Sequence, residues 1–216
     1  MKLVRESIHF QKGVDPKTSL DIGRRALIDE WFKTWAPDVE YEVDDNLNII
    51  VKGDLDSEEI KVKEFPDNLI FIEGYLDLSY ISIDKFPKGI TIGGDLYLED
   101  SPIKESPSDI SVGKSIDLER SKIERLPDNL TVNGDLVLND TLIEKLPNGL
   151  NIRRDLYLER TFIKELPDDI YIGRSIYLRG STIKKLPDNL EVNENLILIN
   201  TPIEELPENL TVKGNI

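Results

Sequence analysis

A phrase of twenty residues repeats along most of the chain. It is clearest from Leu126 to Lys145, LPDNLTVNGDLVLNDTLIEK, and begins again at Leu146. A proline marks each copy, with a first interval of 21 residues and 20 thereafter, at Pro66, Pro87, Pro107, Pro127, Pro147, Pro167, Pro187 and Pro207. A fixed period of this size is the sequence signature of a solenoid, in which successive coils stack on one another.

Apolar residues occupy fixed positions in each copy. Counted from the proline they stand at +3, +5, +9, +11, +16 and +19, which after Pro127 are Leu130, Val132, Leu136, Leu138, Ile143 and Leu146. The spacing of two within +3/+5 and within +9/+11 predicts two short strands per coil, and no stretch of ten residues has helical periodicity. The repeat therefore predicts a mainly β solenoid of parallel strands.

Two other parts of the repeat predict bends. Position +14 is Ser or Thr, and a hydroxyl group at a bend can bond to the backbone. Dipeptides such as Asn133-Gly134 and Gly173-Arg174 separate the two strands and favour a tight turn with positive φ. A hairpin within each repeat is one interpretation of this turn. We favour a corner, because it lets each strand pair with the same strand of the next coil.

Residues 1–52 lie outside the repeat, and their longest periodic segment predicts a helix from about residue 22 to residue 35. Leu27, Trp31 and Trp35 fall on one face of this helix, and Pro37 ends it. We expect the face with the two tryptophans to cover the open end of a core.

The segments 39–43 and 47–51 predict two strands joined by a turn. Together with the helix they make residues 1–52 a small α+β cap of one helix and one hairpin. A solenoid needs such a cap, because its first coil would otherwise expose a slice of the core to water.

The solenoid is expected to occupy residues 53–216. Its first coil, 53–65, departs from the pattern, and about seven regular coils follow. The sequence stops in the middle of a coil, at position +9. A strand edge left without a neighbour can pair with another chain. We therefore expect either self-association through residues 196–216 or a longer natural chain.

Composition limits the classes of function. The chain has no cysteine, which excludes disulfides, thiolate zinc sites and cysteine nucleophiles. The formal net charge is −15 and the basic residues are dispersed, so a phosphate-binding groove for nucleic acid is not expected. His9, the single histidine, indicates no catalytic site. The sequence shows neither an apolar run of about 18 residues nor a signal peptide, which predicts a cytoplasmic protein with no membrane span.

The string from Leu136 to Pro147, LVLNDTLIEKLP, resembles the leucine-rich repeat, with Thr or Ser where most families have Asn. The short period and the Leu-Pro-x-x-Leu phrase look like the bacterial subclass. The longer phrase from Leu126 to Leu138 is similar to repeat proteins common in tailed-bacteriophage genomes. This resemblance implies a curved stack of parallel strands, with the +9/+11 strand lining the concave face. It implies no reaction, and the location would be the host cytoplasm or the virion.

If the residues at +9 and +11 point inward, those at +10 and +12 point out of the concave face, with +13 beside them. Five of the seven tyrosines gather here, beside acidic residues and arginines. Tyr and Arg are favoured anchors of protein interfaces, although Tyr is also a good strand former. The candidate partner-binding residues are Tyr97, Glu99, Asp117, Glu119, Tyr157, Arg160, Tyr177 and Arg179.

These features predict a non-enzymatic protein–protein interaction module, encoded by a phage or a bacterium, without catalytic residues or cofactor. The alternatives are a structural or virion-associated solenoid and an acidic inhibitor that mimics DNA. A further alternative is calcium binding at position +8. Aspartates recur there as Asp95, Asp135 and Asp155, and Ser115, Ser175 and Asn195 interrupt the series.

Overall fold

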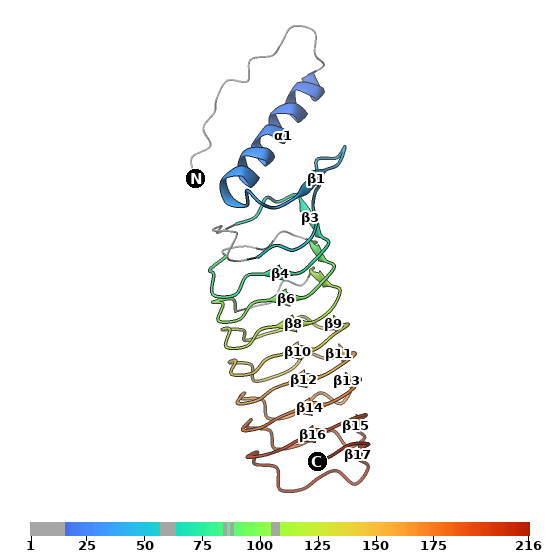
Figure 1. The fold of residues 1–216 in the computed structure, drawn as a ribbon. Helices are drawn as coiled ribbons and strands as arrows, with labels where there is room; N and C mark the ends of the chain where they lie inside the picture. Colours follow the sequence, from blue (N-terminus) through green and yellow to red (C-terminus); the bar gives the residue numbers. More distant parts are fainter. Residues whose placement is uncertain (1–15, 57–63, 84–85, 87–88, 105–108) are drawn as a thin grey trace.

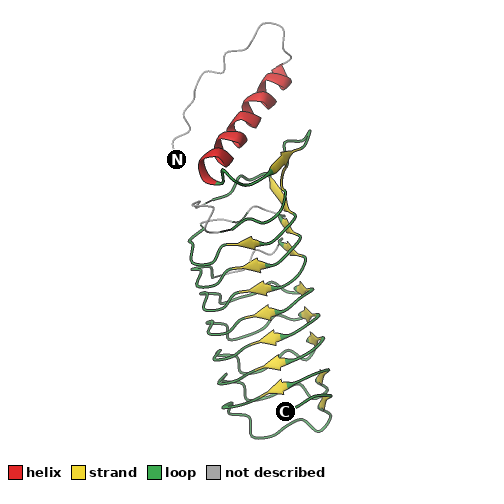
Figure 2. Cartoon of the chain, in the orientation of Figure 1, coloured by secondary structure: helices red, strands yellow, loops and turns green. Residues whose placement is uncertain are grey.

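The computed structural model describes residues 16–56, 64–83, 86, 89–104 and 109–216. His9 and most of the expected first coil, 57–63, lie outside the described residues. Figures 1 and 2 show a helix followed by a column of stacked coils, with the helix at one end of the column and the C-terminal coil at the other. The prediction of a mainly β solenoid with parallel strands is confirmed.

Each coil contributes a short strand to one side of the column, and we call the sheet they form the long sheet (Figure 1). Among the described residues it contains seven strands, all parallel, and each pairs with the equivalent strand of the neighbouring coils, as Leu136 does with Leu156. The strands are β4 (Leu76–Asp77), β6 (Leu96–Tyr97), β8 (Ile116–Asp117), β10 (Leu136–Val137), β12 (Leu156–Tyr157), β14 (Ile176–Tyr177) and β16 (Leu196–Ile197).

The other strand of each coil lies on a second side of the column, where the pairing is interrupted. In the described part of the chain, the strands on this side belong to three separate sheets. The first contains β3 (Leu69–Ile72), β5 (Thr91–Ile92) and β7 (Ser111–Val112); the second β9 (Thr131–Val132), β11 (Asn151–Ile152) and β13 (Tyr171–Ile172); the third β15 (Glu191–Val192) and β17 (Thr211–Val212). The two strands of a coil thus enter different sheets, and the turn between them is a corner.

Apolar side chains from both sides fill the inside of the column. Leu156, Leu158 and Ile163 of one coil have no exposed surface, and the equivalent residues of the neighbouring coils are buried in the same way. Burying one such side chain contributes about 1.5–3 kcal/mol to the stability of the folded chain. Each coil buries several of them, so the stability gained from burial increases with every coil added.

The expected helix is α1 (Pro16–Trp35), which begins earlier than predicted. It buries Ile28 and Phe32, whereas Leu27 is 66% and Trp35 is 42% exposed. The prediction that both tryptophans cover the core is therefore right for Trp31, which packs against the core, and wrong for Trp35. Within the described part of the chain, no helix combines the length and the apolar character that crossing a membrane requires.

The packing of α1 against the hairpin explains this difference. The ring of Phe32 stacks on that of Tyr41, with 3.8 Å between the centroids. Trp31 lies beside this contact, with its ring centroid 5.0 Å from that of Phe32 and 6.1 Å from that of Phe65. Ala36, directly after the helix, is fully buried. These contacts rotate the buried face by one residue from the predicted one, so that Trp35 turns toward solvent.

The hairpin consists of β1 (Tyr41–Val43) and β2 (Ile49–Val51), which pair antiparallel. Asp44 holds its turn, since one carboxylate oxygen accepts hydrogen bonds of 2.8 Å from the N–H groups of Asn46 and Asn48. Arg25 of α1 donates to the carbonyl of Asp44 at 2.7 Å. Strand β2 also pairs in parallel with β3, so the hairpin extends the solenoid and joins α1 to it.

The glycines at the corners differ from their expected conformation, since none of Gly94, Gly134 and Gly173 has a left-handed backbone. Stacking explains their presence, because a Cβ on Gly173 would lie 2.1 Å from the carbonyl oxygen of Arg153. The left-handed position is +13 instead. There φ lies between 53° and 68° in Tyr80, Asp100, Arg120, Asp140, Arg160, Gly180 and Asn200.

The hydroxyl groups at +14 separate into two kinds. Those of Thr141 and Thr161 each donate a 2.7 Å hydrogen bond to the carbonyl three residues earlier, as predicted. The Oγ atoms of Ser101, Ser121 and Ser181 are buried and have no hydrogen-bond partner in the described structure. The side-chain hydroxyl group at +14 therefore bonds to the backbone of the bend in Thr141 and Thr161, and not in these three serines.

We expect Ser121→Ala to change the free energy of unfolding by less than about 0.5 kcal/mol, because it removes a buried hydroxyl group that makes no hydrogen bond. Thr141→Val, which keeps the shape of the side chain, should cost about 1 kcal/mol because it removes the bond to Leu138. Urea unfolding of both variants measures the difference. Equal losses would show that the serine hydroxyl is bonded in solution.

Candidate binding surface

The long sheet presents a strip of outward side chains, which we call the long-sheet face. It comprises positions +8, +10, +12 and +13 of the coils from β4 to β16. Its +10 row follows the pairing register and is partly exposed throughout, as Asp77, Tyr97, Asp117, Val137, Tyr157, Tyr177 and Ile197. The predicted residues at +10 therefore lie in one row. In the view of Figures 1 and 2 the column is nearly straight and shows none of the curvature that the resemblance implied for this face.

Four of the five tyrosines of the long-sheet face form two pairs. The rings of Tyr157 and Tyr177 are parallel, with 4.6 Å between their centroids, whereas those of Tyr75 and Tyr97 meet edge to face at 5.9 Å. Burial raises the pKa of the Tyr157 and Tyr97 hydroxyl groups. The Tyr157–Tyr177 stack covers ring faces and leaves the ring edges outward, an arrangement suited to packing against another protein surface.

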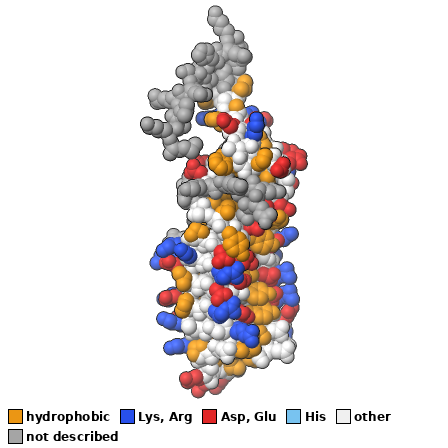
Figure 3. Space-filling view, turned by 60° about the vertical axis from the view of Figure 1, so that its left-hand side comes forward, with side chains coloured by type: hydrophobic (Ala, Val, Ile, Leu, Met, Phe, Trp, Pro, Cys, Tyr) orange, Lys and Arg blue, Asp and Glu red, His pale blue; other side chains and the backbone are white. Residues whose placement is uncertain are grey.

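Charged side chains at +12 and +13 run beside the tyrosines. Arg120 forms ion pairs with Glu99, Glu119 and, at 3.0 Å, Asp100. Figure 3 shows acidic and basic side chains alternating along the column next to a line of hydrophobic ones. Two of the predicted binding residues, Glu99 and Glu119, thus already share an arginine that the prediction did not include.

Arg160 repeats this arrangement two coils further on. Its guanidinium pairs with Asp140 at 2.5 Å and with Glu159 at 3.3 Å. The charge on Asp140 is stabilised by this contact, and the pKa of its carboxyl group is lowered. Arg160 therefore lies on the predicted surface but is held by carboxylates of its own chain.

Arg179 differs from the other two arginines. It stands at +12, is exposed, and forms no ion pair within the described chain. Gly180 follows at the left-handed position, where the other coils carry a side chain. The guanidinium of Arg179 therefore has no carboxylate of its own chain bound to it among the described residues, and its predicted role in binding a partner stays a prediction.

The left-handed backbone at +13 is the signal that sequence reasoning missed. It turns the side chains of Asp100, Arg120, Asp140 and Arg160 along the column, where each meets its counterpart in the next coil. Non-glycine residues pay about 1–2 kcal/mol for this conformation. In the sequence, nothing marks this left-handed position, because it holds Tyr, Asp, Arg, Gly or Asn in different coils.

The +8 residues form a ladder of side-chain oxygens. Asp95 accepts a hydrogen bond from the N–H of Ser115 at 2.8 Å, and the Oγ of Ser115 accepts one from the N–H of Asp135 at 3.1 Å. Asp155 and Asn195 accept equivalent bonds in later coils. Serine and asparagine therefore continue the series that they were thought to interrupt. The described residues contain no group of acidic or histidine side chains arranged to hold a metal ion.

Asp117 is one of two aspartates in the +10 row. Its burial between Tyr97 and Val137 raises its pKa, and the nearby charges of Glu119 and Glu99 raise it further. One carboxylate oxygen accepts a 2.9 Å hydrogen bond from the N–H of Glu119, which acts in the opposite direction. The negative charge of Asp117 therefore costs stability in the folded chain.

We expect Asp117→Asn to raise the melting temperature at pH 7 by about 1–3 °C and to leave it unchanged at pH 3. A raised pKa means that the folded chain binds the proton more readily than the unfolded chain. Stability is therefore lost as the pH rises from the unfolded pKa, about 3.9, through the folded one. Thermal unfolding by circular dichroism at both pH values measures this. Asp168→Asn, on another surface, is the control, and a lower melting temperature for Asp117→Asn at pH 7 would contradict the assignment.

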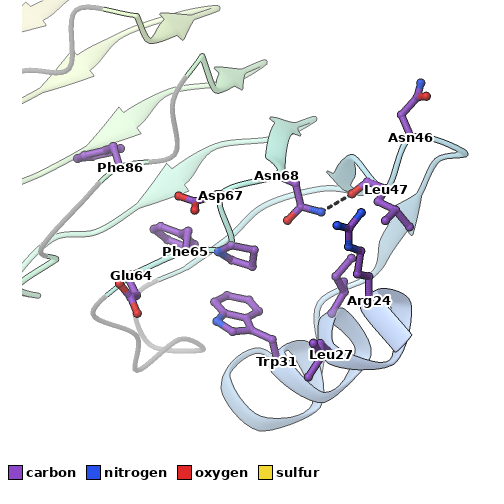
Figure 4. Close-up of a pocket in the computed structure, with 12 residues that line it drawn as sticks. Arg24, Leu27, Trp31, Asn46, Leu47, Glu64, Phe65, Asp67, Asn68 and Phe86 are labelled. Atoms are coloured by element: carbon purple, nitrogen blue, oxygen red, sulfur yellow. Dashed lines mark hydrogen bonds between the residues drawn. The ribbon is translucent and has the colours of Figure 1, made fainter. Parts of the chain in front are cut away.

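A hollow of about 790 Å³ lies between α1 and the first coils (Figure 4). Trp31 and Phe65 form an apolar part of its lining, and Arg24 lies on the helix beside it. The side-chain amide of Asn68 donates to the carbonyl of Leu47. The sequence did not predict this hollow, because its residues are distant in the chain and only the docking of α1 brings them together.

A second hollow, of about 930 Å³, lies along the loops that carry the Leu-Pro phrase. Leu142 and Phe162, at position +15, line it and are about half exposed. The neighbouring coils carry Lys122 and Thr182 at this position. The apolar character is therefore local, unlike the long-sheet face, which continues from coil to coil.

Comparison with known proteins adds no relative: no protein-family model matches the chain, and no curated protein matches it in sequence.

Proposed function

We propose that the chain is a leucine-rich-repeat protein of the short bacterial or bacteriophage type. The twenty-residue coil, the parallel strands and the Leu-Pro-x-x-Leu phrase support this assignment. The threonines at +14 support it too, because Thr141 and Thr161 satisfy carbonyl groups at the bend.

Its function in this proposal is non-enzymatic binding of another protein through the long-sheet face. The observation that carries the proposal is the +10 row of partly exposed side chains, which is tyrosine or apolar from Val137 to Ile197, on the one side of the described column where strand pairing is uninterrupted. A surface fixed in this way loses little conformational entropy on binding. Tyrosines in such a row are frequent interface anchors.

The geometry favours a macromolecular partner over a small substrate. The hollows of about 790 and 930 Å³ are lined by residues of other surfaces. On the long-sheet face the polar groups at +8 and +13 bond to one another, as in the Asp95–Ser115 and Arg160–Asp140 contacts. They support the strip structurally and leave Tyr157, Tyr177 and Arg179 to contact a partner.

The test is affinity capture from host lysate with the intact chain, followed by binding measurements with the purified partner. Tyr157→Ala combined with Tyr177→Ala is expected to weaken binding at least about thirtyfold, the equivalent of about 2 kcal/mol. Tyr171→Ala is the matched control, because Tyr171 is 54% exposed on β13, which belongs to the second side of the column.

Equal binding by the double variant and the parent chain would contradict the proposal. Unchanged binding together with altered assembly would favour a structural or virion-associated role instead. A partner that binds DNA, and that is released by neutralising Glu99 and Glu119, would favour mimicry of DNA.

A further inference from the structure

We propose that the long-sheet face binds an extended protein segment with Lys or Arg at one end and apolar residues at the other. The basic end lies over β4, β6 and β8, and the apolar end lies over β14 and β16. This inference rests on the proposed function and specifies the chemistry of the partner.

The first argument is the distribution of charge along the face. At positions +8, +10, +12 and +13 the described coils of β4, β6 and β8 carry six carboxylates and one arginine, namely Asp77, Asp95, Glu99, Asp100, Asp117, Glu119 and Arg120. At the same positions of the coils of β14 and β16, the described residues include Arg179 and no carboxylate. A partner that matches this face must change from basic to uncharged along its length.

The second argument is that the acidic end retains carboxylates without a cation. Arg120 forms ion pairs with Glu99, Asp100 and Glu119. Asp77, Asp95 and Asp117 accept backbone N–H bonds at 2.8, 2.8 and 2.9 Å, and no ion pair to them occurs among the described residues. Tyr97 stands between Asp77 and Asp117 in the row, so its ring and their carboxylates together favour a cationic side chain.

The third argument is the apolar surface at the other end. Ile199 is 52% exposed at +12, and Ile197 is partly exposed at +10 beside Tyr177. A cationic partner residue placed here would meet Arg179 and lose hydration without gaining an ion pair to the strip, whereas an apolar one would bury the two isoleucines and Tyr177.

The dimensions of the strip favour a linear segment over a folded domain. With about 4.8 Å between neighbouring strands, the distance from β4 to β16 is about 29 Å, and the outward side chains from +8 to +12 span about 14 Å. The area of about 400 Å² is half of the roughly 800 Å² that a standard interface buries on each partner. An extended segment of about nine residues has the same length as the strip.

The experiment selects binders from a displayed library of random nine-residue peptides, using the full chain as bait. The test variant combines Asp77→Asn, Asp95→Asn and Asp117→Asn. Asparagine keeps the oxygen that accepts the backbone bonds, as Asn139 and Asn195 do in the parent chain. The control variant makes the same change of charge elsewhere, with Glu144→Gln, Asp168→Asn and Glu191→Gln, all exposed outside the long-sheet face.

Peptides selected by the parent chain and by the control variant should carry Lys or Arg in one half and apolar residues in the other. Synthetic copies should bind the test variant about tenfold more weakly than the parent at low salt, and this difference should shrink at 0.5 M salt. Peptides without basic residues, equal affinity for the test variant, or a library that yields no binder would each overturn the inference.

The same peptides distinguish this inference from the proposed function. Suppose that the selected peptides lack basic residues but bind the Tyr157→Ala, Tyr177→Ala variant more weakly than the parent chain. Binding through the long-sheet face would then stand, and only the proposed charge pattern of the partner would be refuted. Peptides that lose affinity only for Tyr171→Ala place binding on the other side of the column and refute both.

Discussion

Leu156→Ala should lower the free energy of unfolding by about 2–5 kcal/mol, the range for truncating a fully buried leucine. Leu156 has no exposed surface, and it pairs with Leu136 and Ile176 in the coils on either side. The cavity would therefore open in the middle of the stack, where three coils share one core. Urea unfolding followed by circular dichroism measures the loss.

Leu142→Ala is the matched control for this substitution. Leu142 belongs to the preceding coil, but half of its side chain is exposed, so its truncation should cost less than about 1 kcal/mol. Similar losses of stability for the two variants would contradict the prediction that Leu156 belongs to a core shared by three coils.

Phe32→Ala should destabilise the chain by about 3–5 kcal/mol, because it removes a ring that is 2% exposed and stacked on Tyr41. This contact links α1 to the hairpin, and through β2 to the solenoid, so its loss should also free the helix. Urea unfolding gives the loss of stability, and the near-ultraviolet circular dichroism signal of Trp31 reports whether the helix remains docked.

Trp35→Ala removes a larger ring from the same helix and separates the two possible buried faces. Trp35 is 42% exposed, and we expect the cost to be well below that of Phe32→Ala. A larger loss for Trp35→Ala than for Phe32→Ala would restore the face predicted from the sequence and contradict the structure of the cap.

The helix shows why the periodicity of the apolar residues was not sufficient. Six apolar side chains share an arc of about 140° on the helix, which is wide enough to contain more than one possible buried face: Leu20, Leu27, Ile28, Trp31, Phe32 and Trp35. Large side chains made the face with Trp31 and Trp35 the strongest candidate. The buried face depends on contacts with Tyr41 and on the bonds from Arg25, and these become visible only once the hairpin is in place.

The structure of the solenoid could be predicted in more detail than that of the cap, because the same pattern of residues recurs in every repeat. A spacing of twenty residues places Tyr157 beside Tyr177 once the strands are known to stack in register. The partners of Arg160 could not be deduced in this way. They depend on the left-handed backbone at +13, and no residue type at that position requires it.

The same limit applies to the aspartates at +8. Asp95 and Asp135 resemble metal ligands when carboxylates are counted, and Ser115 then appears to break the pattern. In the structure the shared property is one oxygen that accepts a hydrogen bond from the next coil, and Asp, Ser and Asn all provide it. The residues at +8 have a hydrogen-bond acceptor in common rather than a charge, and a count of carboxylates does not detect it.

The interrupted pairing on the second side of the column has a mechanical consequence. Among the described strands, β7 and β9 belong to different sheets, as do β13 and β15, whereas the long sheet continues past both places. A force that opens these two seams breaks no strand pairing there, only corner bonds such as those from the N–H of Gly134 to Lys114 and from the N–H of Glu194 to Arg174, whereas opening the long sheet breaks a strand pair at every coil. We therefore expect the column to yield first at these two seams, where the coils can tilt against one another while the long sheet stays intact.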